Sequence, residues 1–146
     1  MKKTNKFLSV FLALIMIIGI IPMSSISASA SETSGKCGDD LTWSFDTETG
    51  VLTISGTGPM FEYDVDNYSY NNRPWIDFIG DITEVVFDDG VTSKSKNAFW
   101  ACSNLKSVTI PNTVTEIGRD AFCECESLTS LYIPSSVESI QYGAFY

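Results

Sequence analysis

The 146-residue sequence contains no histidine and has half as many basic as acidic residues. Without histidine the chain has no His-based catalytic triad, no imidazole proton shuttle and no histidine-ligated zinc site. Nine Lys and Arg against eighteen Asp and Glu give a net charge of −9, so the basic surface that phosphate binding needs is missing. We therefore expect neither a nucleic acid nor an anionic membrane surface as a partner.

Motifs of the common enzyme classes are absent as well. The sequence has no G-x-S-x-G motif and no glycine-rich phosphate loop, and a serine or cysteine nucleophile would lack its usual base. A carboxylate pair for glycoside hydrolysis stays open as an alternative, although no feature selects two of the eighteen acidic residues. We predict that the chain is not an enzyme and has no cofactor.

Residues 1–30 follow the layout of a secretory signal peptide. Three lysines precede an apolar run from Phe7 to Ile21, and a stretch of small residues then ends at Ala30. We expect cleavage after Ala30, because the run of about fifteen residues is shorter than the roughly 20 of a spanning helix; an uncleaved anchor is the alternative. The mature chain would carry a charge of −12, and we expect it to be secreted or on a bacterial cell surface, without membrane insertion.

The C-terminal half of the sequence has a 23-residue period. The pair Ala98-Phe99 recurs at Ala121-Phe122 and at Ala144-Phe145, and Cys102 recurs as Cys125. A weaker copy precedes these. Six further positions of one copy match the next, namely Leu105, Val108, Ile110, Pro111, Val114 and Ile117 with Leu128, Leu131, Ile133, Pro134, Val137 and Ile140.

A repeat of this length predicts a solenoid, because one unit is too small to bury its own apolar face. The segment from Leu105 to Pro111 has the L-x-x-L-x-L spacing of a leucine-rich repeat strand. We predict an α/β leucine-rich-repeat solenoid dominated by β structure. It would have a parallel strand ladder, with short turn, 3₁₀ or helical segments on its convex side.

The copy from Cys102 to Phe122 resembles the 23-residue leucine-rich repeat of BspA-like bacterial surface proteins. The resemblance covers residues 82–146. The preceding segments Cys37–Phe45 and Gly50–Gly58 are similar to the lead-in often found before such repeats. The resemblance implies an exported or cell-surface protein whose repeats bind macromolecules, without catalysis in the repeats. The implied partner is an extracellular protein or glycan.

Residues 31–81 are predicted to form a cap and linker ahead of the repeats at 82–146. Leu41–Phe45 alternates apolar and polar residues, and Val51–Ile54 follows a polar turn. Two such segments joined by a turn predict a β-hairpin. A solenoid needs its first apolar face covered, so we expect this hairpin to cap the repeats.

An aromatic-rich stretch at residues 61–78 shows no repeat frame. Its mixture of aromatic side chains with Asp and Asn is typical of sites that stack sugar rings, since an aromatic face and a polar rim serve both parts of a sugar. The alternative is that Phe61, Trp75 and Phe78 pack onto the first repeat, with the tyrosines at the rim. The candidate platform consists of Tyr63, Tyr68, Tyr70 and Trp75.

The same stretch begins like a calcium loop but does not continue as one. Asp64 and Asp66 have the starting spacing, but Tyr68 stands at the fifth position and the later Gly and Glu are missing. An irregular oxygen-ligand site that includes Glu62 is the alternative. We predict no metal site.

The four cysteines are not predicted to form a disulfide framework, although export would permit one. Cys102 and Cys125 share one repeat position, where a small buried side chain suits the stack, so we favour buried thiols there. Cys123 is two positions from Cys125, a poor spacing for a bridge. Cys37 has no assignable partner.

The outward face of the predicted sheet is the candidate binding surface. Its side chains would stack in two columns, and such a ladder is the usual ligand platform of curved solenoids. A plain solvated sheet is the alternative. We expect the exposed Tyr132 to contribute to partner binding. The columns are Val86, Thr109 and Tyr132 in one, and Glu84, Ser107 and Ser130 in the other.

The last copy stops at Tyr146, before its cysteine position and its next strand. A repeat stack needs about three units and a polar terminal cap, so we expect the chain to be the front piece of a longer protein. Self-association through the open end is the alternative. The predicted function is an exported module for adhesion or protein binding, and the alternative is a structural or spacer segment of a larger secreted or wall-associated protein or enzyme.

Overall fold

The computed structural model describes residues 33–63, 72–92 and 96–146. The chain divides into two units, Met1–Ala30 and Ser31–Tyr146, and the structure below is that of the second. The predicted signal peptide lies outside the described residues. Within the described residues we find no helix of the length and apolarity that a membrane span requires.

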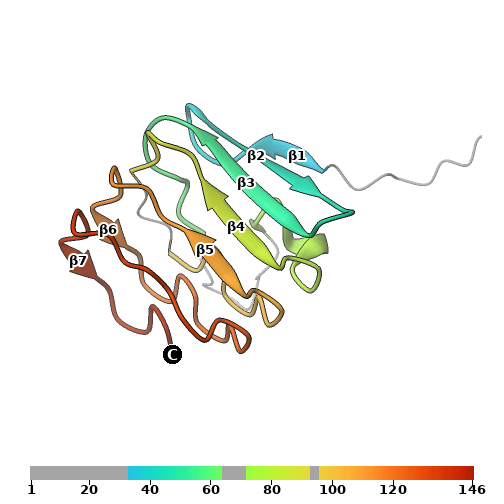
Figure 1. Ribbon diagram of the computed structural model, residues 1–146. Helices are drawn as coiled ribbons and strands as arrows, with labels where there is room; N and C mark the ends of the chain where they lie inside the picture. Colours follow the sequence, from blue (N-terminus) through green and yellow to red (C-terminus); the bar gives the residue numbers. More distant parts are fainter. Residues whose placement is uncertain (1–32, 64–71, 93–95) are drawn as a thin grey trace, which may run out of the picture. The chain divides into compact units, whose positions relative to one another are not determined.

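A mixed five-stranded sheet is the main element of the structure (Figure 1). The first three strands pair antiparallel, whereas β3 with β4 and β4 with β5 pair parallel. The pairing of β4 with β5 joins strands that come from successive repeats, as the 23-residue period predicts. In order across the sheet the strands are β1 (Ser34–Lys36), β2 (Leu41–Asp46), β3 (Val51–Gly56), β4 (Glu84–Phe87) and β5 (Ser107–Thr109).

The predicted hairpin is present as β2 and β3. Along β2 the residues Leu41, Trp43 and Phe45 are buried and the residues between them are exposed, because successive side chains of a strand point to opposite faces. The turn between the strands needs Gly50, whose φ is +74°. An added Cβ there would lie 2.8 Å from the carbonyl oxygen of Asp81, so only glycine fits.

The outer side of the repeats contains turns, one of the three kinds of segment expected there, and also a second, two-stranded sheet that was not expected. Strand β6 (Glu116–Ile117) pairs parallel with β7 (Ser139–Ile140). The 3₁₀ helix η2 (Ile76–Phe78) lies before the repeats, in the aromatic stretch. The predicted dominance of β structure is thus confirmed, while the described part is nearly free of the helix that an α/β class implies.

Left-handed backbone conformations explain these tight turns. Asn97 and Asp120 occupy the same position of successive copies and have φ values of 57° and 52°, and Gly143 follows one period later with 70°. Ala101 and Glu124 form a second such pair, with φ values of 62° and 58°. Residues in this region reverse the chain abruptly and do not continue a right-handed helix.

The third copy does not form the strand that its sequence predicts. No strand is assigned from Leu128 to Ile133, although Ser127 N–H still donates to Ser103 O at 3.2 Å. This segment follows β5 in the stack.

Candidate protein-binding face

The predicted outward columns lie side by side on the sheet. Glu84 is in register with Ser107, and Val86 is in register with Thr109. All four side chains are at least partly exposed, whereas Val85 between them is fully buried. The first two members of each predicted column are therefore neighbours on the exposed side of the sheet.

The hairpin extends both columns, which the sequence did not indicate. One row continues from Val86 through Thr53 to Ser44, and the other continues from Glu84 through Val51 to Asp46. The exposed side of the sheet thus presents rows that cross four strands. We call this surface, made of Ser44, Asp46, Val51, Thr53, Glu84, Val86, Ser107 and Thr109, the sheet face.

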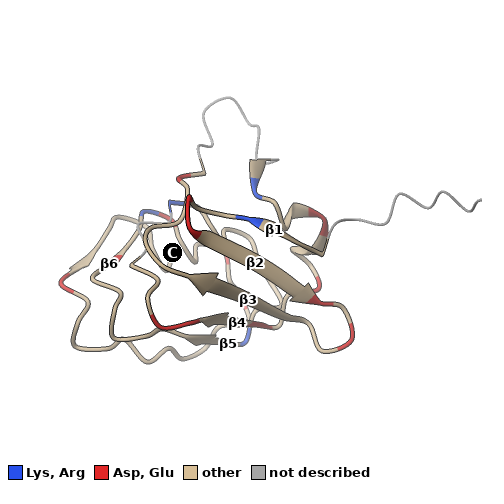
Figure 2. Cartoon of the chain, turned by 90° about the horizontal axis from the view of Figure 1, so that it is seen from above, with Lys and Arg blue, Asp and Glu red and all other residues tan. Residues whose placement is uncertain are grey.

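Hydroxyl groups dominate the chemistry of the sheet face. Four of its eight residues are Ser or Thr, whose hydroxyls both donate and accept hydrogen bonds. Its charged residues are both acidic, Asp46 and Glu84. Figure 2 shows that most of the remaining Asp and Glu lie in the connections between strands. The sheet face can therefore both donate hydrogen bonds to a partner and accept them from it.

The third member of each predicted column is exposed but is not held in a strand. Tyr132 is 78% exposed, and Ser130 is exposed as well. Because the third copy has no assigned strand, their register with Thr109 and Ser107 is not fixed by the ladder. Their roles in binding stay predictions.

The predicted aromatic platform is wrong for two of its four residues. Trp75 is fully buried and Tyr63 is 4% exposed, so neither ring can stack on a sugar. Tyr68 and Tyr70 lie outside the described residues. The packing alternative is correct for Trp75 but not for Phe61, which is 45% exposed.

Trp75 instead occupies the aromatic column of the repeats. Its ring stacks on Phe99 at 5.5 Å between centroids, Phe99 stacks on Phe122 at 5.5 Å, and Phe122 stacks on Phe145 at 5.7 Å. The indole N–H of Trp75 donates to Ala98 O at 2.9 Å. Trp75 stands one position outside the repeat frame that Phe99 and Phe122 share, so the period alone does not find it.

Two buried polar side chains connect the aromatic stretch to the first repeat turn by hydrogen bonds. Arg73 donates from Nη1 to the carbonyl oxygen of Trp100 at 2.6 Å, and burial lowers the pKa of its guanidinium. Asn97 donates from Nδ2 to the carbonyl oxygen of Tyr63 at 2.8 Å. These bonds satisfy backbone acceptors inside the protein, so both residues are structural.

All four cysteines are free thiols in this structure. Cys102 is fully buried, and Cys125 is partly buried with its thiol donating to Phe99 O at 3.2 Å. The preference for thiols at this repeat position is thus confirmed, although Cys125 is not fully enclosed. Burial raises the pKa of both Cys37 and Cys125 to about 12, so these thiols stay protonated and are weak nucleophiles and metal ligands.

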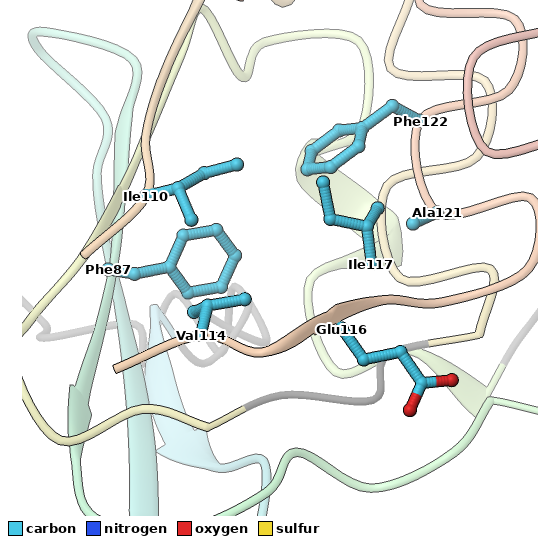
Figure 3. Close-up of a pocket in the computed structure, with 7 residues that line it drawn as sticks. All are labelled: Phe87, Ile110, Val114, Glu116, Ile117, Ala121 and Phe122. Carbon is cyan, nitrogen blue, oxygen red and sulfur yellow. The ribbon is translucent and has the colours of Figure 1, made fainter. Parts of the chain in front are cut away.

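The described residues hold no metal-ligand cluster, and a small cavity lies within the repeats. No group of three or more Cys, Asp or Glu there is placed to bind an ion, while Asp64 and Asp66 lie outside the described part. A cavity of about 20 Å³ is lined by Phe87, Ile110, Val114, Glu116, Ile117, Ala121 and Phe122 (Figure 3). It holds one water at most, and the Glu116 carboxylate points away from it.

Comparisons with known proteins concern the repeats. A family model described as "BspA type Leucine rich repeat region (6 copies)" matches residues 77–146. A leucine-rich repeat protein from Eubacterium ventriosum, solved by crystallography, is 33% identical over 73% of this chain, with a TM-score of 0.62. A leucine rich cell surface protein from Faecalibacterium prausnitzii is 20% identical over 78% of this chain, with a TM-score of 0.47. No curated protein matches.

These structures are much longer than the matching part. The chain spans 28% of the Eubacterium protein and 31% of the Faecalibacterium protein. At 33% identity the Eubacterium structure supports the fold of the described residues, and its leucine-rich repeats agree with the stack seen in this chain.

Proposed function

The chain belongs to the BspA-type leucine-rich repeat family through residues 77–146, and on this premise we propose that it is an exported module that binds an extracellular protein through its sheet face. The observation that carries the proposal is the register of the two rows, which places eight at least partly exposed side chains on one surface across four strands. A regular, exposed array of this kind suits contact with a protein surface better than enclosure of a small molecule.

The charge of the chain favours a partner with a basic surface. Without residues 1–30 the chain carries a charge of −12, and both charged residues of the sheet face are acidic. A basic partner would be attracted over a distance of about one Debye length, roughly 8 Å at physiological salt. We therefore propose an extracellular protein with a basic patch, and a glycan is the other outcome that the experiment below distinguishes.

We further propose that the stack is a short solenoid which the hairpin caps. Strand β3 pairs parallel with β4, and Leu52 and Ile54 of β3 are fully buried in register with Val85 and Phe87. The hairpin thereby covers the apolar side that the first repeat would otherwise expose. This arrangement supports a role in which the repeats present a surface rather than perform chemistry.

Export is the remaining part of the proposal. The basic, apolar and small-residue segments within residues 1–30 support secretion or display on a bacterial cell surface. Expression of the full chain in a bacterial host, followed by N-terminal sequencing of the exported product, tests this. We expect the product to begin at Ser31. A product found only inside the cell with its leader intact would contradict it.

The binding proposal is tested on an array of extracellular matrix proteins and glycans. Thr109→Arg places a large cation in the centre of the sheet face, and we expect it to weaken binding to any protein that the chain recognises by about tenfold or more. Thr115→Arg is the matched control, because Thr115 is also exposed but lies outside the sheet face. Equal binding by both variants, or binding to no array member, would overturn the proposal, and the second result would favour a spacer role.

A further inference from the structure

A groove lies at the end of the sheet where β2 turns into β3 and where β4 begins (Figure 1). It is open to solvent and has a volume of about 320 Å³, which gives room for one long side chain or a small ligand. We call it the hairpin groove. Its lining includes Phe45, Glu48, Gly50, Phe78, Asp81 and Thr83.

Hydrogen bonds hold together the two segments that line the hairpin groove. One segment is the turn that ends at Gly50, and the other is the loop that ends at Thr83. Thr83 N–H donates to Gly50 O at 2.8 Å, and the Thr83 hydroxyl donates to Thr49 O at 3.2 Å. Within the loop, Asp81 N–H donates to Phe78 O at 2.7 Å. The groove is therefore formed in the free protein, and a ligand does not have to order the segments around it.

Two aromatic rings form the apolar part of the hairpin groove. The centroids of the Phe45 and Phe78 rings are 4.7 Å apart. Phe45 is 6% exposed, whereas Phe78 is half-buried, so Phe78 retains the larger accessible ring surface. The face of an aromatic ring carries partial negative charge and attracts a cation. The floor of the groove is therefore suited to a side chain that combines methylene groups with a positive charge.

The charged residues that line the hairpin groove are both acidic. Glu48 belongs to the turn and Asp81 to the loop, and both are exposed. No Lys or Arg of the described residues is part of the lining; Lys106 lies beside it, with its N–H donating to Thr83 O at 2.9 Å. Carboxylates on both segments, next to an aromatic ring, complement a long side chain that ends in a cation.

The hairpin groove adjoins the sheet face. Gly50 and Thr83 of the groove directly precede Val51 and Glu84, which are paired in register and belong to the sheet face. Because β3 and β4 are parallel, both strands begin beside the groove. A protein that lies on the sheet face can therefore place a side chain in the groove at the same time.

We infer that the hairpin groove receives an arginine side chain of the partner protein. The inference rests on the proposed function for the nature of this partner, a protein with a basic patch. The methylene groups of the arginine pack on Phe78, and its guanidinium meets the carboxylates of Glu48 and Asp81. Arginine suits the groove better than lysine, because its planar and weakly hydrated guanidinium stacks on aromatic faces and binds a carboxylate through two parallel hydrogen bonds.

The test titrates the full chain with N-acetyl-arginine amide and follows the backbone N–H signals by NMR. We expect saturable shifts centred on Glu48, Gly50, Asp81 and Thr83, and nuclear Overhauser contacts between the methylene groups of the probe and the Phe78 ring. N-acetyl-citrulline amide has nearly the same shape without the charge. We expect it to bind at least about tenfold more weakly, because it loses both the ring–cation and the carboxylate contacts.

Two double variants separate the hairpin groove from the overall charge of the chain. Glu48→Gln with Asp81→Asn keeps the shape of the groove but removes both carboxylates, and it should weaken binding of the arginine probe by about tenfold. Asp88→Asn with Asp89→Asn removes the same charge from exposed positions that follow the end of β4. This matched control should change the affinity by less than about twofold, because salt screens distant charges.

Selective binding of the arginine probe, with the loss confined to the groove variant, supports the inference. It is overturned if the groove signals do not shift, if both probes bind equally, or if both double variants lose the same affinity. Groove signals that shift with protein concentration before any probe is added would make a second copy of the chain the occupant, and they too would overturn it.

The array experiment with Thr109→Arg tests the proposed function separately, because it changes the centre of the sheet face and not the hairpin groove. Partner binding that is unchanged by Thr109→Arg would count against the sheet face. Loss of selectivity between the two probes would count against the hairpin groove alone.

Discussion

Trp75 and Phe99 stack face to face, with ring centroids 5.5 Å apart and planes 9° from parallel. The indole N–H adds a hydrogen bond to Ala98 O, beside the phenylalanine it stacks on. The Trp75 side chain thereby contacts the first repeat in two ways, by ring stacking and by a hydrogen bond to a backbone carbonyl. This contact joins the two parts of residues 31–146 that the sequence distinguishes.

Replacing Trp75 should therefore destabilise the protein strongly. Trp75→Ala is expected to lower the free energy of unfolding by about 3–5 kcal/mol, as large-to-small core changes do. Trp75→Phe keeps a stacked ring but leaves Ala98 O without its donor, at a cost of roughly 1–3 kcal/mol. Urea unfolding followed by circular dichroism measures both. An alanine variant that is no less stable than the phenylalanine variant would contradict the stacking argument.

Tyr132 should affect binding without affecting stability. Its ring is 78% exposed, so Tyr132→Ala is expected to change the free energy of unfolding by no more than about 0.5 kcal/mol. If it contacts a partner, its loss should weaken binding by about tenfold, as loss of an interface tyrosine often does. The matched control is Tyr142→Ala, since Tyr142 is 82% exposed but lies outside the predicted columns. Titration calorimetry with a partner found on the array measures the affinity of each variant. Equal affinities of the Tyr132→Ala and Tyr142→Ala variants would show that Tyr132 is not part of the binding site.

The buried thiols make stability fall at alkaline pH. The pKa of Cys37 is raised to about 12 by burial, whereas an unfolded thiol ionises near about 8.5. Above about pH 8.5 the unfolded state therefore loses a proton that the folded state keeps, and stability declines by up to about 1.4 kcal/mol per pH unit and thiol. Urea midpoints between pH 8 and 10 under reducing conditions should show this decline. Cys37→Ala should reduce the slope, and an unchanged slope would exclude Cys37 as its source.

Acid should weaken the β2–β3 turn through Asp46. Its carboxylate accepts hydrogen bonds from Glu48 N–H at 2.8 Å and Thr49 N–H at 3.2 Å, which lower its pKa. The stabilisation is full above the unfolded pKa of about 4 and is lost as the pH falls through the lower folded value. Asp46→Ala should therefore lower the urea midpoint at pH 6 but much less at pH 2. Glu48→Gln is the control, and equal effects of Asp46→Ala at both pH values would contradict the assignment.

Gly143 should be intolerant of a side chain because of Asp120. A Cβ at Gly143 would overlap with Oδ1 of Asp120, in a backbone with φ of 70°. Gly143→Ala is expected to cost about 1 kcal/mol or more from the left-handed conformation and the close contact together. In an Asp120→Gly background the contact disappears and the cost should shrink, so the two changes are coupled. Thermal unfolding of the four chains measures the coupling, and strictly additive effects would refute it.

The register of β4 with β5 is the part of the molecule that the sequence predicted best. Two periods act there together, since alternation along a strand separates Val108 from Thr109 and the 23-residue repeat places Thr109 beside Val86. Both signals come from many residues at once. The hairpin could be predicted for the same reason, because buried and exposed residues alternate along the whole of β2.

The elements that were missed depend on single residues or very short segments. Strands β1, β6 and β7 have three, two and two residues, which is too short for any periodicity. Ala101 and Glu124 adopt left-handed φ values although they are not glycines. Such a conformation cannot be predicted from the residue type. Both the platform and its rim alternative expect an exposed Tyr63, but its ring packs edge-on against Trp75 at 5.4 Å between centroids, a contact set by tertiary structure.

The ring column also has a mechanical consequence. Among the residues that the structure describes, Phe99 and Phe122 each have a stacked ring on both sides, whereas Phe145 has one on a single side. Tension applied at Tyr146 should therefore peel the last coil first and meet higher resistance at Phe122. Each released 23-residue coil would lengthen the chain by roughly 75–80 Å at about 3.4 Å per residue, so force would be resisted in a series of discrete steps.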